Sequence, residues 1–128
     1  MVILISIGKP DIRQLTVLSE ALVKLNMIQM KRSRIPALYE SGVRYSREAA
    51  PARGPRHERF QTAAQVLRNR KGDCEDLAAY RVAELRLRGI AARPWVIRAS
   101  GRVFHVQVRY PDGRIEDPSA RLGMRGSA

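Results

Sequence analysis

The chain has 128 residues, 45% of them hydrophobic, so it is long enough for one domain with its own core and too apolar for wholesale disorder. A single cysteine excludes an internal disulfide and a cysteine-rich zinc site. The formal net charge is +12, and 20 of the 24 basic residues are arginine. The excess lies mainly in residues 1–72, which carry 14 basic and 5 acidic side chains.

An arginine-rich surface suits phosphate and carboxylate groups, so nucleic acid, an anionic envelope and an acidic protein are candidate partners. A genome whose base composition favours arginine codons would also explain the charge. We favour this second explanation, because no groove-reading motif and no aromatic–basic interleaving accompanies the charge. Nonspecific nucleic-acid binding by residues 31–71 is a further prediction, and such binding would fall steeply as salt rises.

The first seven residues are apolar but too short to span a bilayer, and neither a basic segment nor a small-residue cleavage site flanks them. We interpret them as a strand or the lead-in to the first helix. We expect a soluble, cytoplasmic protein without a targeting signal of its own.

The stretch from Asp11 to Met30 predicts an amphipathic helix, because apolar residues recur at three- and four-residue spacing. Pro36 ends this region, since the residue before a proline resists helical dihedrals. Residues 37–59 are rich in proline and glycine and predict an arm or long loop over the core. A short helix over residues 62–69 and a basic turn at 70–72 follow.

Cys74, the only cysteine, falls at the start of a predicted helix. Asp73 is a natural N-cap, Asp76 completes an acidic capping box, and Gly89 stands where a C-terminal cap belongs. A thiol in the first turn meets unsatisfied N–H groups and the positive end of the helix dipole. Both favour the thiolate, which is the form that attacks carbonyl carbon.

Beyond Gly89 the pattern changes to strands. Residues 94–97 and 103–108 predict two strands, residues 110–114 a turn, and residues 115–117 a short third strand that Pro118 ends. Helices followed by an antiparallel sheet make an α+β fold. In it the N-terminal half is helical and the cysteine-bearing helix packs on a small sheet.

A single helical cysteine is more often a buried hydrophobe than a nucleophile. Asp73, Glu75 and Asp76 argue against a core position, but their negative charges also oppose ionisation of the thiol, so a positive partner has to compensate. A histidinium would serve. His57 lies in the arm, where a solvated loop residue is the simple interpretation, whereas His105 lies within the second predicted strand.

The hairpin after that strand decides whether Asp117 can reach His105. Residues 111–113, Pro-Asp-Gly, fit a three-residue loop, a type I turn closed by a glycine in the left-handed region. This register sets Gln107 opposite Asp117, so Asp117 shares a face with His105 and lies diagonal to it, within side-chain reach. A two-residue loop would instead set Asp117 opposite Val108, on the other face.

A cysteine, a histidine and an aspartate so arranged predict nucleophilic catalysis. Asp117 would fix the imidazole tautomer, and His105 would exchange protons with the sulfur and the leaving group. The backbone N–H of Cys74 is a candidate oxyanion donor, and the indole N–H of Trp95 is a second. The simple alternative for His105 is a half-buried strand histidine bonded to a backbone carbonyl.

These residues resemble the transglutaminase-like (papain-like) cysteine enzymes. Residues 72–78, Gly-Asp-Cys-Glu-Asp-Leu-Ala, and residues 85–93 look like that family's nucleophile helix and the strand entry after it. Residues 104–106 and 116–119 look like its histidine and aspartate strands. The resemblance covers about residues 60–120 and is closest to bacterial transglutaminase-like cysteine proteinases. Residues 1–59 are then an arginine-rich, helical N-terminal extension of the same single domain.

The resemblance implies a hydrolase or acyltransferase that acts on amide bonds of a protein or peptide through Cys74, His105 and Asp117. Compact chains of this kind also occur in phage and prophage genomes. The alternative function is therefore a non-catalytic virion or assembly protein with this fold and a virion or cell-envelope partner. Such a chain would be virion-associated rather than cytoplasmic.

No cofactor is required for such chemistry. In some of those proteinases, however, acidic residues beside the nucleophile bind calcium, and Asp73, Glu75 and Asp76 match these positions. Hard oxygen ligands suit Ca²⁺, and the ion would offset the negative charge around the thiol. Helix capping is the alternative role for these carboxylates.

Overall fold

The computed structural model describes residues 2–6, 11–47, 57–100 and 103–124. Its elements in chain order are β1 (Val2–Ser6), α1 (Ile12–Arg32), the 3₁₀ helix η1 (Leu38–Glu40), β2 (Arg44–Tyr45), β3 (His57–Gln61), α2 (Ala63–Asn69), β4 (Lys71–Gly72), α3 (Cys74–Leu87), β5 (Arg93–Ser100), β6 (Val103–Arg109), β7 (Ile115–Glu116) and α4 (Pro118–Arg121). The mixture confirms the predicted α+β class.

The described strands form three small sheets. β5, β6 and β7 make the predicted antiparallel sheet in that order, while β1 pairs antiparallel with β3 and β2 pairs parallel with β4. The first residues are therefore a strand, and the N-terminal half contains strands as well as helices. The arm expected over residues 37–59 contains η1, β2 and the start of β3, and residues 48–56 lie outside the described residues.

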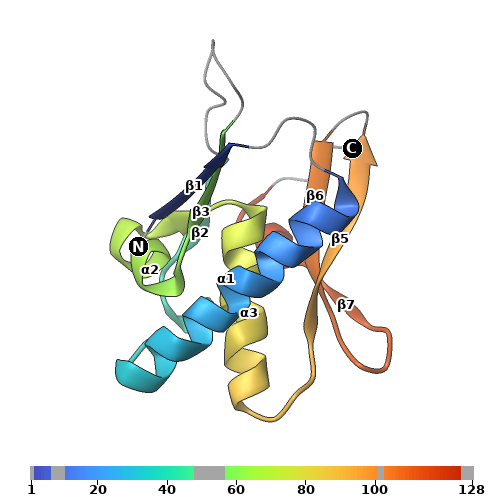
Figure 1. Cartoon of the computed structure of the whole chain (residues 1–128). Helices are drawn as coiled ribbons and strands as arrows, with labels where there is room; N and C mark the ends of the chain where they lie inside the picture. The colour runs from blue at the N-terminus through green and yellow to red at the C-terminus, as the bar shows by residue number, and fades with distance from the viewer. Residues whose placement is uncertain (1, 7–10, 48–56, 101–102, 125–128) are drawn as a thin grey trace.

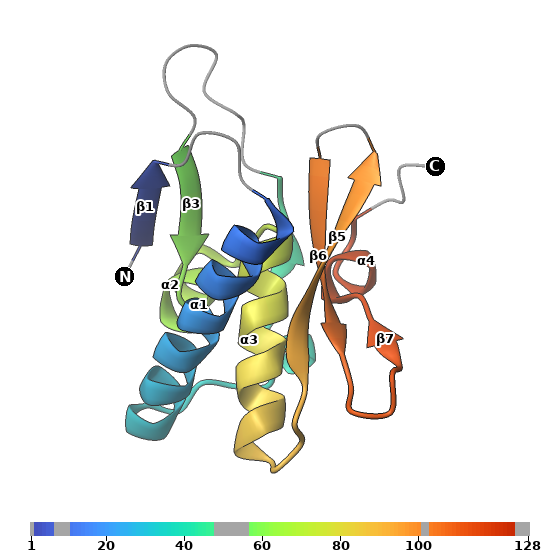
Figure 2. The same cartoon turned by 45° about the vertical axis from the view of Figure 1, so that its right-hand side comes forward.

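Helices α1 and α3 lie side by side on one face of the three-stranded sheet (Figures 1 and 2), where α1 packs on β5 and α3 on β6. Their apolar faces and the inward side chains of the strands make the main core. Its buried members include Leu15, Leu22, Val23, Ala78, Val82, Val96, Val106 and Val108. A second cluster joins η1, α2, α3 and the end of α4.

Helix α1 belongs to the core that positions the cysteine helix. Its N-cap is Asp11, whose carboxylate accepts from the Gln14 N–H at 2.7 Å. Near its other end the side chain of Asn26 accepts from the N–H of Ala63 at 2.7 Å. Thr62, the N-cap of α2, makes no side-chain cap bond. The side-chain oxygen of Asn26 therefore takes the place of a cap for the first N–H of α2.

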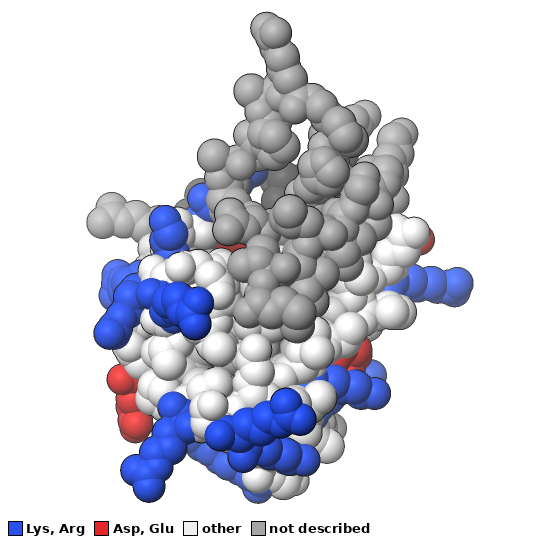
Figure 3. Space-filling model, turned by 60° about the vertical axis from the view of Figure 1, so that its left-hand side comes forward, with Lys and Arg blue, Asp and Glu red and all other residues white. Residues whose placement is uncertain are grey.

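Basic side chains stand out from the face shown in Figure 3, with few acidic ones among them. Among the side chains of residues 31–71 whose exposure the structure describes, the exposed basic ones are Lys31, Arg32, Arg34, Arg44, Arg47, Arg68, Arg70 and Lys71. None of these pairs with a carboxylate of a described residue. Nucleic-acid binding by this segment stays a prediction. In the described part of the chain, no helix is both long enough and apolar enough for a membrane span.

Candidate active site

Cys74 is the first residue of α3, as the sequence predicts. The carboxylate of Asp73, the N-cap, accepts from the Asp76 N–H at 3.2 Å, and that of Asp76 accepts from the Asp73 N–H at 3.3 Å. This reciprocal pair is the predicted acidic capping box. At the other end Gly89 has φ +87°, a left-handed conformation that suits glycine after a helix.

Asp76 also anchors the start of α3 to β3, which the sequence did not suggest. Its side chain is fully buried, and its two oxygens accept from the backbone N–H and the side-chain amide of Gln61 at 2.7 Å and 3.0 Å. The amide oxygen of Gln61 in turn accepts from Asn69 at 2.7 Å. The first turn of α3 is therefore held by two donors of Gln61 in β3, whose side chain is held in turn by Asn69 of α2.

These contacts bear on the calcium prediction. Both oxygens of Asp76 accept hydrogen bonds, and an oxygen of Asp73 caps the helix. Among the residues that the structure describes, no group of three or more His, Cys, Asp or Glu side chains is arranged to hold a metal ion. The observed contacts are those of caps, the alternative role, and calcium binding stays a prediction.

The thiol of Cys74 lies against β6, where the backbone N–H of Val106 interacts with it. Tyr110 N–H donates to Arg114 O at 2.9 Å across the hairpin. Backbone N–H groups of alternate strand residues point to the same edge, so the Val106 N–H also faces the β7 edge. Because β7 ends at Glu116, the pairing of β6 stops there and leaves this N–H to the thiol. Cys74 thus meets β6 one residue from His105.

The predicted hairpin register is confirmed. Val108 pairs with Glu116 and Arg109 with Ile115, and the same register sets Gln107 opposite Asp117. Gly113, at the end of the three-residue loop, has φ +92° as a type I turn with a left-handed closing residue requires.

His105 and Asp117 meet as this register predicts. His105 Nε2 lies 2.8 Å from Asp117 Oδ2, and the side-chain amide of Gln107 donates to the same oxygen at 3.4 Å. Since Nε2 faces the carboxylate, Nδ1 is the ring nitrogen left for a proton exchange with the sulfur. The structure records no hydrogen bond between His105 and Cys74 themselves.

Asp117 has a second role that sequence reasoning missed. It is the N-cap of α4, and its Oδ1 accepts from the Ala120 N–H at 3.2 Å. Pro118 does end β7, but it does so by starting a helix. Asp followed by Pro is a recognisable signal for such a start, because proline is favoured at the first helical position. The cap fixes the carboxylate that faces the histidine.

The ionisation of Asp117 is favoured on balance. Burial raises its pKa, but hydrogen bonds from His105, from the Ala120 N–H and from Gln107 outweigh this effect and hold the pKa below its ordinary value. Asp117 is therefore a carboxylate at neutral pH, and its partner Nε2 carries a proton.

The thiol of Cys74 behaves differently from what its place at a helix start suggests. Burial, followed by the charges of Glu75 and Asp73, raises its pKa well above the ordinary value. The Val106 N–H acts in the opposite direction without cancelling this rise. Desolvation and neighbouring carboxylates thus outweigh the helix dipole, and the resting thiol is neutral.

Trp95 lies on β5 directly opposite Gln107, and Ile97 lies opposite His105. Cross-strand partners share a face, so the indole is on the same face as the histidine. Arg93 and Arg109 stack over the indole, with their guanidinium carbons 5.2 Å and 4.3 Å from its centre. The oxyanion role of Trp95 stays a prediction.

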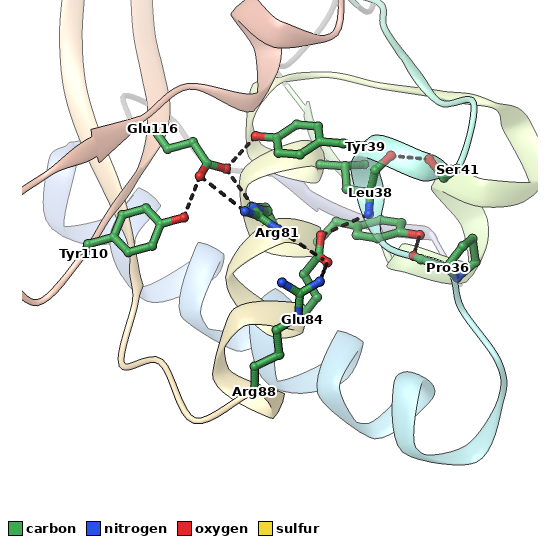
Figure 4. Close-up of polar contacts among 10 residues, drawn as sticks. Pro36, Leu38, Tyr39, Ser41, Arg81, Glu84, Arg88, Tyr110 and Glu116 are labelled. Atoms are coloured by element: carbon green, nitrogen blue, oxygen red, sulfur yellow. Dashed lines mark hydrogen bonds and ion pairs between the residues drawn. The ribbon is translucent and has the colours of Figure 1, made fainter.

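A polar network that no sequence pattern indicated surrounds the residue before Asp117. The buried carboxylate of Glu116 accepts from the hydroxyls of Tyr39 and Tyr110 and from Arg81 Nε at 2.7 Å (Figure 4). Arg81 also pairs with Glu84, which accepts from the Leu38 N–H at 3.0 Å. The network joins η1, α3 and both arms of the hairpin beside the site.

The family model described as transglutaminase-like superfamily matches residues 23–113. The chain belongs to the transglutaminase-like superfamily. The matched region of this transglutaminase-like chain includes Cys74 and His105, while Asp117 lies beyond its end. It begins inside α1, in the N-terminal half that the sequence predicts to be an extension. No curated protein and no solved structure matches the chain.

Proposed function

We propose that this transglutaminase-like chain is a cysteine hydrolase or acyltransferase that acts on amide bonds of a protein or peptide. Cys74 is the nucleophile, His105 the general acid and base, and Asp117 the group that orients the imidazole. The observation that carries the proposal is the 2.8 Å bond between His105 Nε2 and Asp117, formed beside the point where the thiol meets β6.

In the first half-reaction the proton of the Cys74 thiol passes to His105 Nδ1 as the sulfur attacks the amide carbonyl carbon. The carbonyl π electrons move to oxygen, and the Cys74 N–H and the Trp95 indole N–H are the proposed donors to that oxyanion. Collapse of the intermediate expels the amine, which takes the proton from His105. A thioester on Cys74 remains.

In the second half-reaction water or an amine attacks the thioester and gives a proton to His105, which returns it to the departing sulfur. Water yields a carboxylic acid and an amine acceptor yields a new amide. Because the resting thiol is neutral, proton transfer to His105 accompanies attack and does not precede it as a standing ion pair.

Alkylation of the single cysteine by iodoacetamide tests this function. We expect His105→Ala to slow alkylation of Cys74 near neutral pH by about tenfold or more, since general-base assistance is worth at least that much. His57→Ala, the same change at the other histidine, is the matched control and leaves the rate unchanged. Equal rates in wild type and His105→Ala would refute the proposed base.

A non-catalytic virion or assembly module of phage origin is the second candidate. Two observations favour it: the Cys74 side chain packs against the main core, and it shares no hydrogen bond with His105. In this case Cys74→Ser leaves the biological function intact, whereas reversing the charge of the arginine-rich arm over residues 37–59 abolishes it. A correctly folded Cys74→Ser chain without function counts against this candidate.

A further inference from the structure

The face of the sheet that carries His105 also carries a cluster of one tryptophan and two arginines. Arg93 and Arg109 are cross-strand partners on β5 and β6, and Trp95 lies one rung closer to the histidine. Both guanidiniums stack on its indole. Stacking of this kind fixes a guanidinium and leaves its N–H edges for other groups.

The chain contains its own comparison for this arrangement. Tyr39 also has two stacked arginines, Arg81 and Arg121, at 4.8 Å and 5.0 Å. There one of the two arginines has carboxylate partners, because Arg81 binds Glu116 and Glu84.

At Trp95 the balancing acid is missing. Neither Arg93 nor Arg109 pairs with a carboxylate of any residue that the structure describes. Arg93 is exposed, and Arg109 and Trp95 are partly exposed, so all three are open to a ligand. Arg93, Arg109 and Trp95 therefore offer the N–H donors and the aromatic surface of a carboxylate-binding site, and no carboxylate of a described residue occupies it.

We propose that Trp95, Arg93 and Arg109 form a substrate subsite that binds an acidic side chain of the peptide whose amide bond is attacked by Cys74. This inference rests on the proposed function and adds the class of substrate. Two guanidiniums on one indole fit a carboxylate, which arginine binds through paired N–H groups.

The register sets the expected spacing of the acidic residue. Arg109 is four residues from His105 on the same strand, which corresponds to about 13 Å at 3.3 Å per residue. An extended peptide along this face covers that distance in about four residues. A peptide is favoured over nucleic acid because the cluster offers one aromatic ring, and Ile97 and the exposed Ile115 share its face.

Binding is tested in the Cys74→Ala chain, where no turnover occurs. The probe is an acetylated, amidated peptide with a glutamate four residues before or after a glutamine, compared with the same peptide carrying glutamine in place of the glutamate. Titration calorimetry measures both affinities. Trp95, the only tryptophan of the chain, reports occupancy through its fluorescence.

We expect the glutamate peptide to bind about tenfold tighter, as a charge-assisted bidentate contact predicts. The advantage should vanish in Arg93→Gln/Arg109→Gln and persist in Arg121→Gln, which removes a stacked arginine at Tyr39. Equal affinities, or an advantage that survives the double change, overturn the proposal. So does a single-stranded oligodeoxynucleotide that binds tighter than the glutamate peptide and needs the same two arginines.

The test is separable from that of the proposed function. The arginine changes leave Cys74, His105 and Asp117 in place, so alkylation of Cys74 in the double variant should remain at the wild-type rate. If the two peptides bind equally well while alkylation of Cys74 still depends on His105, the subsite is refuted and the proposed function is not.

Discussion

The two carboxylate oxygens of Asp117 have different partners: Oδ2 lies 2.8 Å from His105 Nε2 and also accepts from Gln107, whereas Oδ1 accepts from the Ala120 N–H that begins α4. The cap holds the carboxylate in one orientation relative to the histidine. Because helix capping and histidine orientation use different oxygens, a substitution can separate the two functions.

Asp117→Asn should separate them. Asparagine keeps an oxygen for the cap but removes the charge that favours a protonated Nε2 and stabilises an imidazolium. We expect the thermal unfolding midpoint to stay within a few degrees of wild type, while alkylation of Cys74 near neutral pH slows by about tenfold or more. Asp112→Asn is the matched control, because Asp112 lies exposed in the same hairpin and pairs only with Arg114 among the described residues. A wild-type alkylation rate in Asp117→Asn would remove Asp117 from the proposed site.

The parts of this site that were predictable depend on local rules. A capping box spans four residues and a hairpin register depends on its loop, so the start of α3 and the facing of Gln107 and Asp117 could be worked out from the sequence. The packing of α1 into the core and the network around Glu116 join segments far apart in the chain. Tyr39 and Glu116 are 77 residues apart, and no spacing rule brings them together.

The environment of the thiol was harder to predict for another reason. The helix start and the acidic neighbours of Cys74 act on its pKa in opposite directions, and the sequence does not reveal how deeply the sulfur is buried. Burial proves to be the largest influence. The pKa of the Cys74 thiol therefore depends mainly on how deeply tertiary packing buries the sulfur.

The raised pKa of Cys74 predicts how its alkylation varies with pH. The rate should rise with pH and continue to rise beyond the ordinary thiol range, because the thiolate is disfavoured first by burial and then by Glu75 and Asp73. Glu75→Gln removes one of these charges, so we expect alkylation at pH 7 to become about threefold to tenfold faster. Glu40→Gln, at an exposed position of η1, is the control. A rate profile with an ordinary or lowered thiol pKa in the wild type would contradict this account.

The exposed basic residues at the end of α2 and in β4 predict a salt-dependent affinity for nucleic acid. If residues 31–71 bind single-stranded DNA, Arg68→Glu/Arg70→Glu/Lys71→Glu should weaken binding at low salt and flatten the dependence of log K on log salt by about two units or more. Arg114→Glu, an exposed arginine outside this segment, serves as the control. Fluorescence anisotropy with a labelled oligonucleotide measures both quantities. Affinity that is absent at low salt, or independent of salt, ends this prediction.

Gly113 should be sensitive to any side chain for conformational reasons alone. An added Cβ would meet nothing within 4 Å, but the residue has φ +92°. We expect Gly113→Ala to reduce the free energy of unfolding by about 1 kcal/mol, and Gly113→Asn by less, because asparagine tolerates the left-handed region better. Urea denaturation measures both. An equal loss in the two variants would mean that the strain lies elsewhere than in the backbone of the turn.

Glu116 should contribute more to the stability of the fold than a more exposed ion-paired glutamate such as Glu20. The side chain of Glu116 is 8% exposed and that of Arg81 is 13% exposed, so Glu116→Gln takes the nearer of two carboxylate partners from a nearly buried arginine, which keeps Glu84 at 3.5 Å. We expect a loss of about 3 kcal/mol in the free energy of unfolding. Glu20→Gln is the control, since the Arg86–Glu20 pair is more exposed, at 22% and 32%, and should contribute about 1 kcal/mol or less.

The pH dependence of that loss has a defined sign. Burial raises the pKa of Glu116, but hydrogen bonds from Arg81, Tyr110 and Tyr39 outweigh it, and the folded-state pKa lies below the ordinary value of 4.5. A carboxyl group with a lowered folded pKa stabilises the protein fully above its unfolded pKa, and the contribution disappears as pH falls through the folded pKa. The difference in unfolding free energy between wild type and Glu116→Gln should therefore be constant near neutral pH and shrink below about pH 4.5. A difference that grows on acidification would mean that Glu116 is protonated in the folded protein and that Arg81 does not carry the interaction.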